Sequence, residues 1–210
     1  MVTRPHWGRG IVRVDGVSAG ADTEGVTDPD VRPGLVTRRA FVTVLATAAP
    51  VLLVPKTLLA ASPVTRVLRF VHTHTSERLA VEYFTRGDYL ADGLAAVNHF
   101  LRDFRTGDEH VIDPTLLDLL HGVAERTGTD QPFQVISGYR SPATNGLLRQ
   151  RSEGVAARSL HMVGKAIDIR LADVPLPKLR AAALDVQGGG VGFYPASDFV
   201  HVDTGRVRVW

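Results

Sequence analysis

Hydrophobic periodicity is confined to the part of this 210-residue chain that follows residue 62, and this boundary limits what the chain can fold into. Residues 1–36 combine Gly, Pro, Asp, Thr and Arg with scattered valines, without a persistent helical or strand period. A segment without an apolar face cannot bury enough surface to offset its conformational entropy. We therefore expect residues 1–36 to form a disordered extension and residues 62–210 to form one folded domain.

The segment 37–61 has the order of an export signal. Arg38 and Arg39 precede an uncharged, moderately apolar run over residues 40–55, and small residues follow at 60–62. This order indicates the twin-arginine route, which leads to the periplasm or the cell envelope. The run is short and rich in Ala and Thr for a membrane span. Cleavage after Ala60 would leave Leu58 at the −3 position, so an uncleaved membrane anchor stays open, as does a buried core helix.

The pattern after residue 62 predicts an α+β domain. Alternating segments at 64–71 and 78–84 predict a hairpin, and further strands are expected at 133–136, 166–171 and 199–203. Helical spacing is found at 88–105, 113–128, 141–151 and 175–184, and the glycines of 188–192 predict a tight turn. These elements predict a small antiparallel sheet with flanking helices.

The composition restricts the chemistry that this domain can perform. The chain has no cysteine, so a metal site must be built from His, Asp and Glu. Its 24 basic and 22 acidic residues leave a formal net charge of +2, which is too small an excess to argue for nucleic acid. The 44% hydrophobic and 22% charged residues exclude a multi-span membrane protein.

Three side chains are candidates for a metal site. His161 is expected in a turn, Asp168 in the following strand and His201 in a later strand. Two imidazoles and one carboxylate that converge on a sheet leave one coordination position open, as in catalytic zinc sites. This donor set suits one Zn²⁺ better than Ca²⁺ or Mg²⁺, which prefer oxygen ligands. From the spacing alone, hydrogen-bonded turn and strand histidines explain the pattern equally well.

Four motifs in one order carry a resemblance to a known family. They are Ser-Gly-Tyr-Arg-Ser at 137–141, Ser-x-His-x-x-Gly-x-Ala-x-Asp at 159–168, Gly-Gly-Val-Gly-Phe-Tyr-Pro at 189–195 and Phe-Val-His-Val-Asp-Thr-Gly at 199–205. With Asn-His-Phe-x-Arg-Asp-Phe-Arg at 98–105, they make residues 64–210 resemble the zinc D-Ala-D-Ala carboxypeptidase and murein endopeptidase group. Within that group the chain is most similar to the exported branch typified by murein endopeptidase K. The resemblance implies a hedgehog/D-Ala-D-Ala peptidase-like fold with a zinc site on its sheet.

The resemblance also implies roles for individual residues. His161, Asp168 and His201 match the zinc ligands, and Arg140 matches a substrate-binding arginine. A guanidinium beside zinc can hold a carboxylate or stabilise a developing oxyanion. Ser159 is expected to position the turn of His161 or a substrate carbonyl, and a simple turn cap is an equal alternative.

Asp203 is expected to be the general base, with Asp198 as the rival. Asp203 follows His201 by two residues, so both side chains share one face of a strand, where Asp203 can accept a proton or orient the imidazole. Asp198 precedes His201 by three residues, the position of an acidic residue in the carboxypeptidases of the group. Asp198 reaches that face only if the chain bends near Pro195.

The resemblance implies a zinc endopeptidase that cleaves peptide cross-links of peptidoglycan outside the cytoplasm. One alternative is a D,D- or L,D-carboxypeptidase that trims stem peptides. Another is a catalytically inactive, metal-bearing module that binds the cell wall. Peptidoglycan is the expected partner in each case, nucleic acid is not, and membrane attachment is expected only through the amino-terminal segment.

Overall fold

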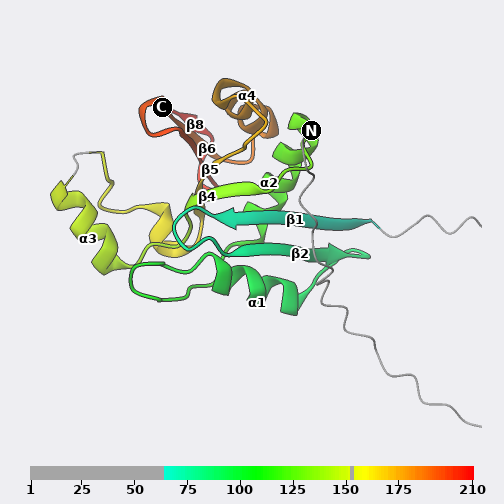
Figure 1. Ribbon diagram of the computed structural model, residues 1–210, viewed down its shortest axis with the longest axis horizontal. Helices are drawn as coiled ribbons and strands as arrows, with labels where there is room; N and C mark the ends of the chain where they lie inside the picture. Colours follow the sequence, from blue (N-terminus) through cyan, green and yellow to red (C-terminus); the bar gives the residue numbers. More distant parts are fainter. Residues whose placement is uncertain (1–63, 152–153) are drawn as a thin grey trace, which may run out of the picture. The chain divides into compact units, whose positions relative to one another are not determined.

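The computed structural model describes residues 64–151 and 154–210, and these residues form an α+β fold (Figure 1). The extension and the export segment predicted for residues 1–36 and 37–61 lie outside the described residues. The strands are β1 (Thr65–His72), β2 (Arg78–Thr85), β3 (Asp88–Tyr89), β4 (Phe133–Ser137), β5 (Ala166–Arg170), β6 (Gly190–Tyr194), β7 (Phe199–Asp203) and β8 (Arg208–Val209). The helices are α1 (Ala91–Phe100), α2 (Pro114–Thr127), α3 (Pro142–Arg151) and α4 (Leu176–Val186), with short 3-10 helices η1 (Leu160–Val163) and η2 (Pro195–Ser197).

The described strands form one mixed sheet in the order β3-β2-β1-β4-β5-β7-β6-β8. Two neighbouring pairs, β1 with β4 and β6 with β8, are parallel, and the other pairs are antiparallel. The α+β class is confirmed, but the expected small antiparallel sheet is wrong in size and in strand direction. The parallel β1–β4 pair arises because the chain returns through β2, α1 and α2 before it forms β4 beside β1, and a parallel pair needs such a crossover.

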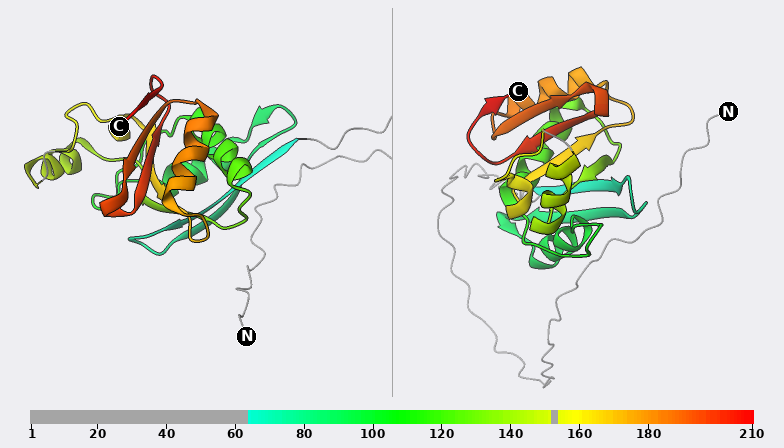
Figure 2. Two further views of the ribbon diagram at one scale, coloured as in Figure 1. Left: turned by 90° about the horizontal axis from the view of Figure 1, so that it is seen from above. Right: turned by 90° about the vertical axis from the view of Figure 1, so that its left-hand side faces the viewer.

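Helix α2 covers the apolar face of the sheet. Asp113 accepts a hydrogen bond from the Thr115 backbone N–H and caps its amino end, and Gly128 ends it in the left-handed conformation. Leu116, Leu117, Leu120 and Val123 are fully buried. Helix α2 contacts β1 and α4, and α4 contacts β6 and β7, so the two helices lie side by side in Figure 2.

Alternation along the central strands separates the core from the site. Ile167 and Ile169 of β5 and Val202 of β7 are fully buried in the hydrophobic core. Asp168 and His201, which alternate with them and lie opposite each other in register, therefore face the other side of the sheet.

Two elements differ from the sequence-based prediction. The helix expected at 88–105 covers only Ala91–Phe100, because the Leu101 carbonyl accepts a bond from the Tyr139 N–H and the Asp103 carboxylate bonds the Arg105 N–H. The expected turn at 188–192 contains the start of strand β6.

Helix α3 was expected and is present, but only Thr144 and Asn145 near its start are buried. It extends away from the sheet in Figures 1 and 2. Across the described helices, none has both the length and the apolar character needed to cross a membrane.

Candidate metal and substrate site

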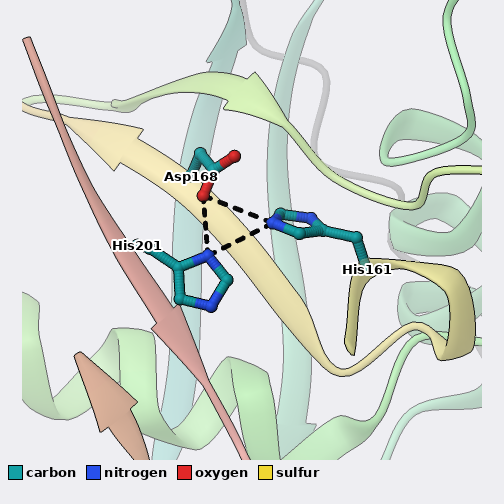
Figure 3. A group of neighbouring side chains, drawn as sticks. All are labelled: His161, Asp168 and His201. Carbon is teal, nitrogen blue, oxygen red and sulfur yellow. Dashed lines mark hydrogen bonds and ion pairs between the residues drawn. The ribbon is translucent and has the colours of Figure 1, made fainter. Parts of the chain in front are cut away.

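Three donor atoms converge on the face of the sheet opposite the core (Figure 3). The Nε2 atom of His161 lies 3.2 Å from Nδ1 of His201 and 3.3 Å from Oδ1 of Asp168, and the last two atoms are 2.8 Å apart. Donors held about 2.0–2.1 Å from a tetrahedral zinc are separated by about 3.3 Å. The structure thus brings the three predicted ligands together at a spacing that fits one metal ion.

The turn that carries His161 is fixed from both ends. It forms η1, which begins after Ser159 and ends at Gly164 in the left-handed conformation. A Cβ atom on Gly164 would collide with the Val111 carbonyl, so a larger residue cannot occupy this position without displacing the turn. The His161 Nδ1–H donates to the Gly138 carbonyl at 2.7 Å. Because that carbonyl can only accept, Nδ1 carries a hydrogen, and Nε2 is the nitrogen that faces the other two donors.

The ring of His201 is oriented by Asp203. Its Nδ1 faces Asp168, and its Nε2–H donates to Oδ2 of Asp203 at 3.0 Å. Asp203 is 0% exposed. Its carboxylate also accepts from both terminal nitrogens of Arg208, at 3.0 and 2.8 Å, and from the backbone N–H groups of Gly190 and Gly205.

Asp168, Asp203 and the His201 imidazole between them shift one another's pKa values. Burial alone would raise the pKa of Asp168, but His161 and His201 outweigh it and hold that pKa well below its usual range. Burial would likewise raise the pKa of Asp203, but His201, Arg208 and the Gly205 N–H lower it far more. Burial would lower the pKa of His201, and its bonds to the two carboxylates instead raise it to about 9.

Arg140 lies beside the three donors. Its backbone N–H donates to the His161 carbonyl, and its guanidinium lies 3.6 Å from Oδ2 of Asp168 and 3.4 Å from the Ser137 hydroxyl. The side chain is 12% exposed, and burial lowers its pKa. The Nε atom of Arg140 is buried and has no hydrogen-bond partner among the described residues.

The donors open into a cleft of about 470 Å³, which is within the usual range for ligand sites. Its polar and charged lining residues are Arg140, Arg158, Ser159, His161, Asp168, Ser197, His201 and Arg208. Its aromatic lining residues are Tyr194, Phe199 and Trp210. Ser159 is thus placed at the cleft, although its side chain makes no capping hydrogen bond to η1.

Asp198 is placed away from the three donors. Asp198 follows η2 in the left-handed conformation, so the chain bends before β7. This bend was the condition for Asp198 to reach the face of His201, but it does not bring the side chain there. Its side chain is 66% exposed and pairs with Arg170 at 2.9 Å. It is not among the described residues that line the cleft.

Residues 60–210 match the family described as peptidoglycan L,D-endopeptidase MepK. The chain is 43% identical over 166 residues to the peptidoglycan L,D-endopeptidase MepK of Escherichia coli (strain K12), an alignment that spans 79% of this chain and 91% of that protein. It is 38% identical over 176 residues to the probable peptidoglycan L,D-endopeptidase MepK of Haemophilus influenzae (strain ATCC 51907 / DSM 11121 / KW20 / Rd), covering 82% and 95% of the two chains.

The chain belongs to the MepK family. This assignment confirms the resemblance that the four motifs carried.

Sequence reasoning missed several groups around the site of this MepK family member. Arg208 and Trp210 follow the last motif, and no residue pattern links them to His201. The Gly138 carbonyl is a backbone group, so a search for side chains that bind metals cannot find it. Tyr194 lies within the 189–195 motif, but sequence reasoning interpreted only the glycines of 188–192 structurally, as a tight turn.

Proposed function

We propose that this protein is a zinc-dependent endopeptidase that cleaves peptidoglycan cross-links at an amide bond between an L-configured and a D-configured residue. The observation that carries the proposal is the convergence of His161, Asp168 and His201 in one cleft of a MepK family member. The names of the relatives favour this reaction over terminal trimming by a carboxypeptidase. The proposal places the domain outside the cytoplasm, where peptidoglycan is found, after export through the segment at 37–61.

His161, Asp168 and His201 would hold one Zn²⁺ on the sheet. The fit is supported by the donor spacing and by the second nitrogen of each imidazole, which already has an acceptor. When bound, the ion supplies Lewis-acid polarisation of the peptide carbonyl and acidifies a water molecule.

We assign Asp203 to the orientation of His201 rather than to proton transfer, which revises the role expected from the sequence. A general base must reach the proton that it removes, and its pKa is best placed near the working pH. Asp203 has no exposed surface, bonds the ring nitrogen on the side away from the other donors, and has a pKa far below neutrality. A carboxylate hydrogen-bonded to a ligating histidine fixes the ring and raises its basicity.

Arg140 is the residue that we assign to substrate binding. Its guanidinium lines the cleft next to Asp168, and its Nε–H has no acceptor among the described residues. A buried donor without a partner is costly, and a substrate carboxylate or carbonyl would remove that cost. Ser159 lines the same cleft and can donate to a second peptide carbonyl.

Digestion of purified cross-linked muropeptide dimers tests the function. The full chain should convert L,D-cross-linked dimers to monomers, a chelator should abolish this conversion, and added Zn²⁺ should restore it. D,D-cross-linked dimers are the substrate control, and His161→Ala, with its expected loss of metal, is the protein control. Release of a terminal residue alone would indicate a carboxypeptidase. A zinc-loaded protein that binds the dimer without cutting it would indicate a cell-wall-binding module.

A further inference from the structure

Three aromatic rings form one wall of the cleft, and no catalytic role accounts for them. The rings of Tyr194 and Phe199 stack at 4.6 Å, and the Trp210 indole N–H donates to the Tyr194 hydroxyl at 2.7 Å. The Trp210 ring lies 5.3 Å from the ring of His201. We refer to Tyr194, Phe199 and Trp210 as the aromatic wall.

The position of Trp210 is fixed by the surrounding structure. Its backbone exchanges hydrogen bonds with the neighbouring strand, from the Phe193 N–H to its carbonyl at 3.0 Å and from its own N–H to the Val191 carbonyl at 3.3 Å. The Arg208 guanidinium lies 4.6 Å from the ring centre, within range of a cation–π interaction. A Cβ atom on Gly192 would lie 2.7 Å from the indole, so only glycine there leaves room for the ring.

The exposed Trp210 ring lies beside the three donor atoms. Trp210 is 46% exposed and lines the same cleft as the three donors. An extended peptide advances about 3.3–3.6 Å per residue, so a ring 5.3 Å from His201 faces a substrate residue within about two positions of the cleaved bond. The Tyr194 hydroxyl accepts from Trp210 and keeps its own O–H as a donor for a peptide carbonyl.

We propose that the aromatic wall is a specificity subsite, in which Trp210 covers the aliphatic part of the side chain of a substrate residue next to the cleaved bond. This inference rests on the proposed function. A flat indole suits a long, unbranched hydrocarbon chain, because it buries apolar area while the polar end of the chain stays in solvent. The glycan is the other apolar-faced component of peptidoglycan, but it joins the far end of the stem peptide, beyond the reach set by the distance to His201.

A purely structural role for Trp210 makes a different prediction. Its ring packs on Arg208, which holds Asp203, which orients His201. If Trp210 only supported this chain of contacts, its removal would weaken metal binding. If it forms the subsite, its removal weakens substrate binding and leaves metal binding intact.

Kinetics on the L,D-cross-linked dimer separate these roles. Trp210→Ala in the full chain should raise KM about tenfold, the effect of losing about 1.4 kcal/mol of apolar contact, with kcat and zinc affinity near wild type. Trp210→Phe retains a ring and should raise KM less. Val209→Ala, an exposed neighbour in β8, is the matched control and should change nothing. Reduced zinc affinity with unchanged KM in Trp210→Ala would overturn the subsite.

Fluorescence provides a readout that does not depend on turnover. The sequence contains two tryptophans, so Trp7→Phe leaves Trp210 as the single indole. In the metal-free protein, titration with the dimer should shift the Trp210 emission and saturate. The same shift with soluble glycan chains lacking peptide would overturn the side-chain assignment.

The two proposals fail in distinguishable ways. A wild-type protein that cleaves no dimer removes the proposed function and the subsite with it. A protein that cleaves the dimer while the emission and the KM of Trp210→Ala stay unchanged removes the subsite alone.

Discussion

Asp203 illustrates how the partners of a side chain decide its role. A carboxylate two residues from a metal-ligating histidine can serve as a base only if it has a free lone pair and contact with solvent or substrate. Here five donor groups surround a side chain with no exposed area. Such a carboxylate stays ionised and fixes its neighbours, as hydrogen-bonded carboxylates behind zinc-binding histidines do.

Asp203→Asn is therefore expected to weaken metal binding. The amide places an N–H₂ group among donors, so at least one bond to His201 or Arg208 is lost. Zinc affinity, measured by competition with a chromogenic chelator, should fall about 10–100-fold, and activity should recover when zinc is raised to saturation. Asp198→Asn is the control, because that exposed carboxylate pairs with Arg170, away from the three donors, and its loss should leave zinc affinity unchanged. Normal zinc affinity with lost activity in Asp203→Asn would return the base role to this residue.

At the scale of elements, the loop after α1 holds the segment that carries Arg140. Asp103 is 1% exposed and accepts from the Ser141 N–H at 2.9 Å and from the Arg105 N–H at 3.0 Å. The Leu101 carbonyl accepts from the Tyr139 N–H at 2.8 Å. These bonds give the 98–105 motif a structural purpose, since they fix both sides of Arg140.

Asp103→Asn should destabilise the protein in a pH-dependent way. Burial would raise the pKa of Asp103, but its hydrogen bonds lower it below the ordinary 3.8. A folded-state pKa below the unfolded value contributes stability above about pH 4, and this contribution is lost as the pH falls further. Urea unfolding should show a loss of about 1–3 kcal/mol that is constant from pH 7 to about pH 4 and shrinks as the pH falls further. Asp108→Asn, on an exposed aspartate of the same loop, should show neither effect. A pH-independent loss would argue against the ionised carboxylate as the cause.

The sequence predicted elements with strong local signals and missed those defined by distant partners. Helix α2 was predicted within one residue, because Asp113 and Gly128 mark its ends and leucines mark its buried face. Strand β6 was missed because its glycines, which indicate a turn, leave room for side chains that are distant in sequence: Gly190 for those of Asp203 and Arg208, and Gly192 for the Trp210 ring. The three candidate donors could be predicted because His and Asp are recognisable metal ligands, whereas the partners of Asp203 depend on tertiary contacts.

At the scale of the whole molecule, the residues after 63 contain a complete hydrophobic core. The cluster of buried apolar side chains runs from Leu68 to Val202 and joins both ends of the sheet through α2 and α4. A chain that begins at Pro63 should therefore fold alone. Its thermal unfolding should be cooperative, with a Tm within about 2 °C of the full chain, which corresponds to less than about 1 kcal/mol. A broad, non-cooperative melt would show that residues 1–62 contribute to the fold.

The parallel pairing of β1 with β4 also has a kinetic consequence. Phe70 lies opposite Phe133, so this part of the sheet closes only after a hairpin and two helices have been spanned, and such long-range closures are slow. The Gly138 carbonyl that orients His161 follows directly after β4. In a refolding chain, the ability to capture zinc at the proposed site should consequently appear later than helical circular dichroism, so that the protein passes through a compact stage in which that site is not yet assembled.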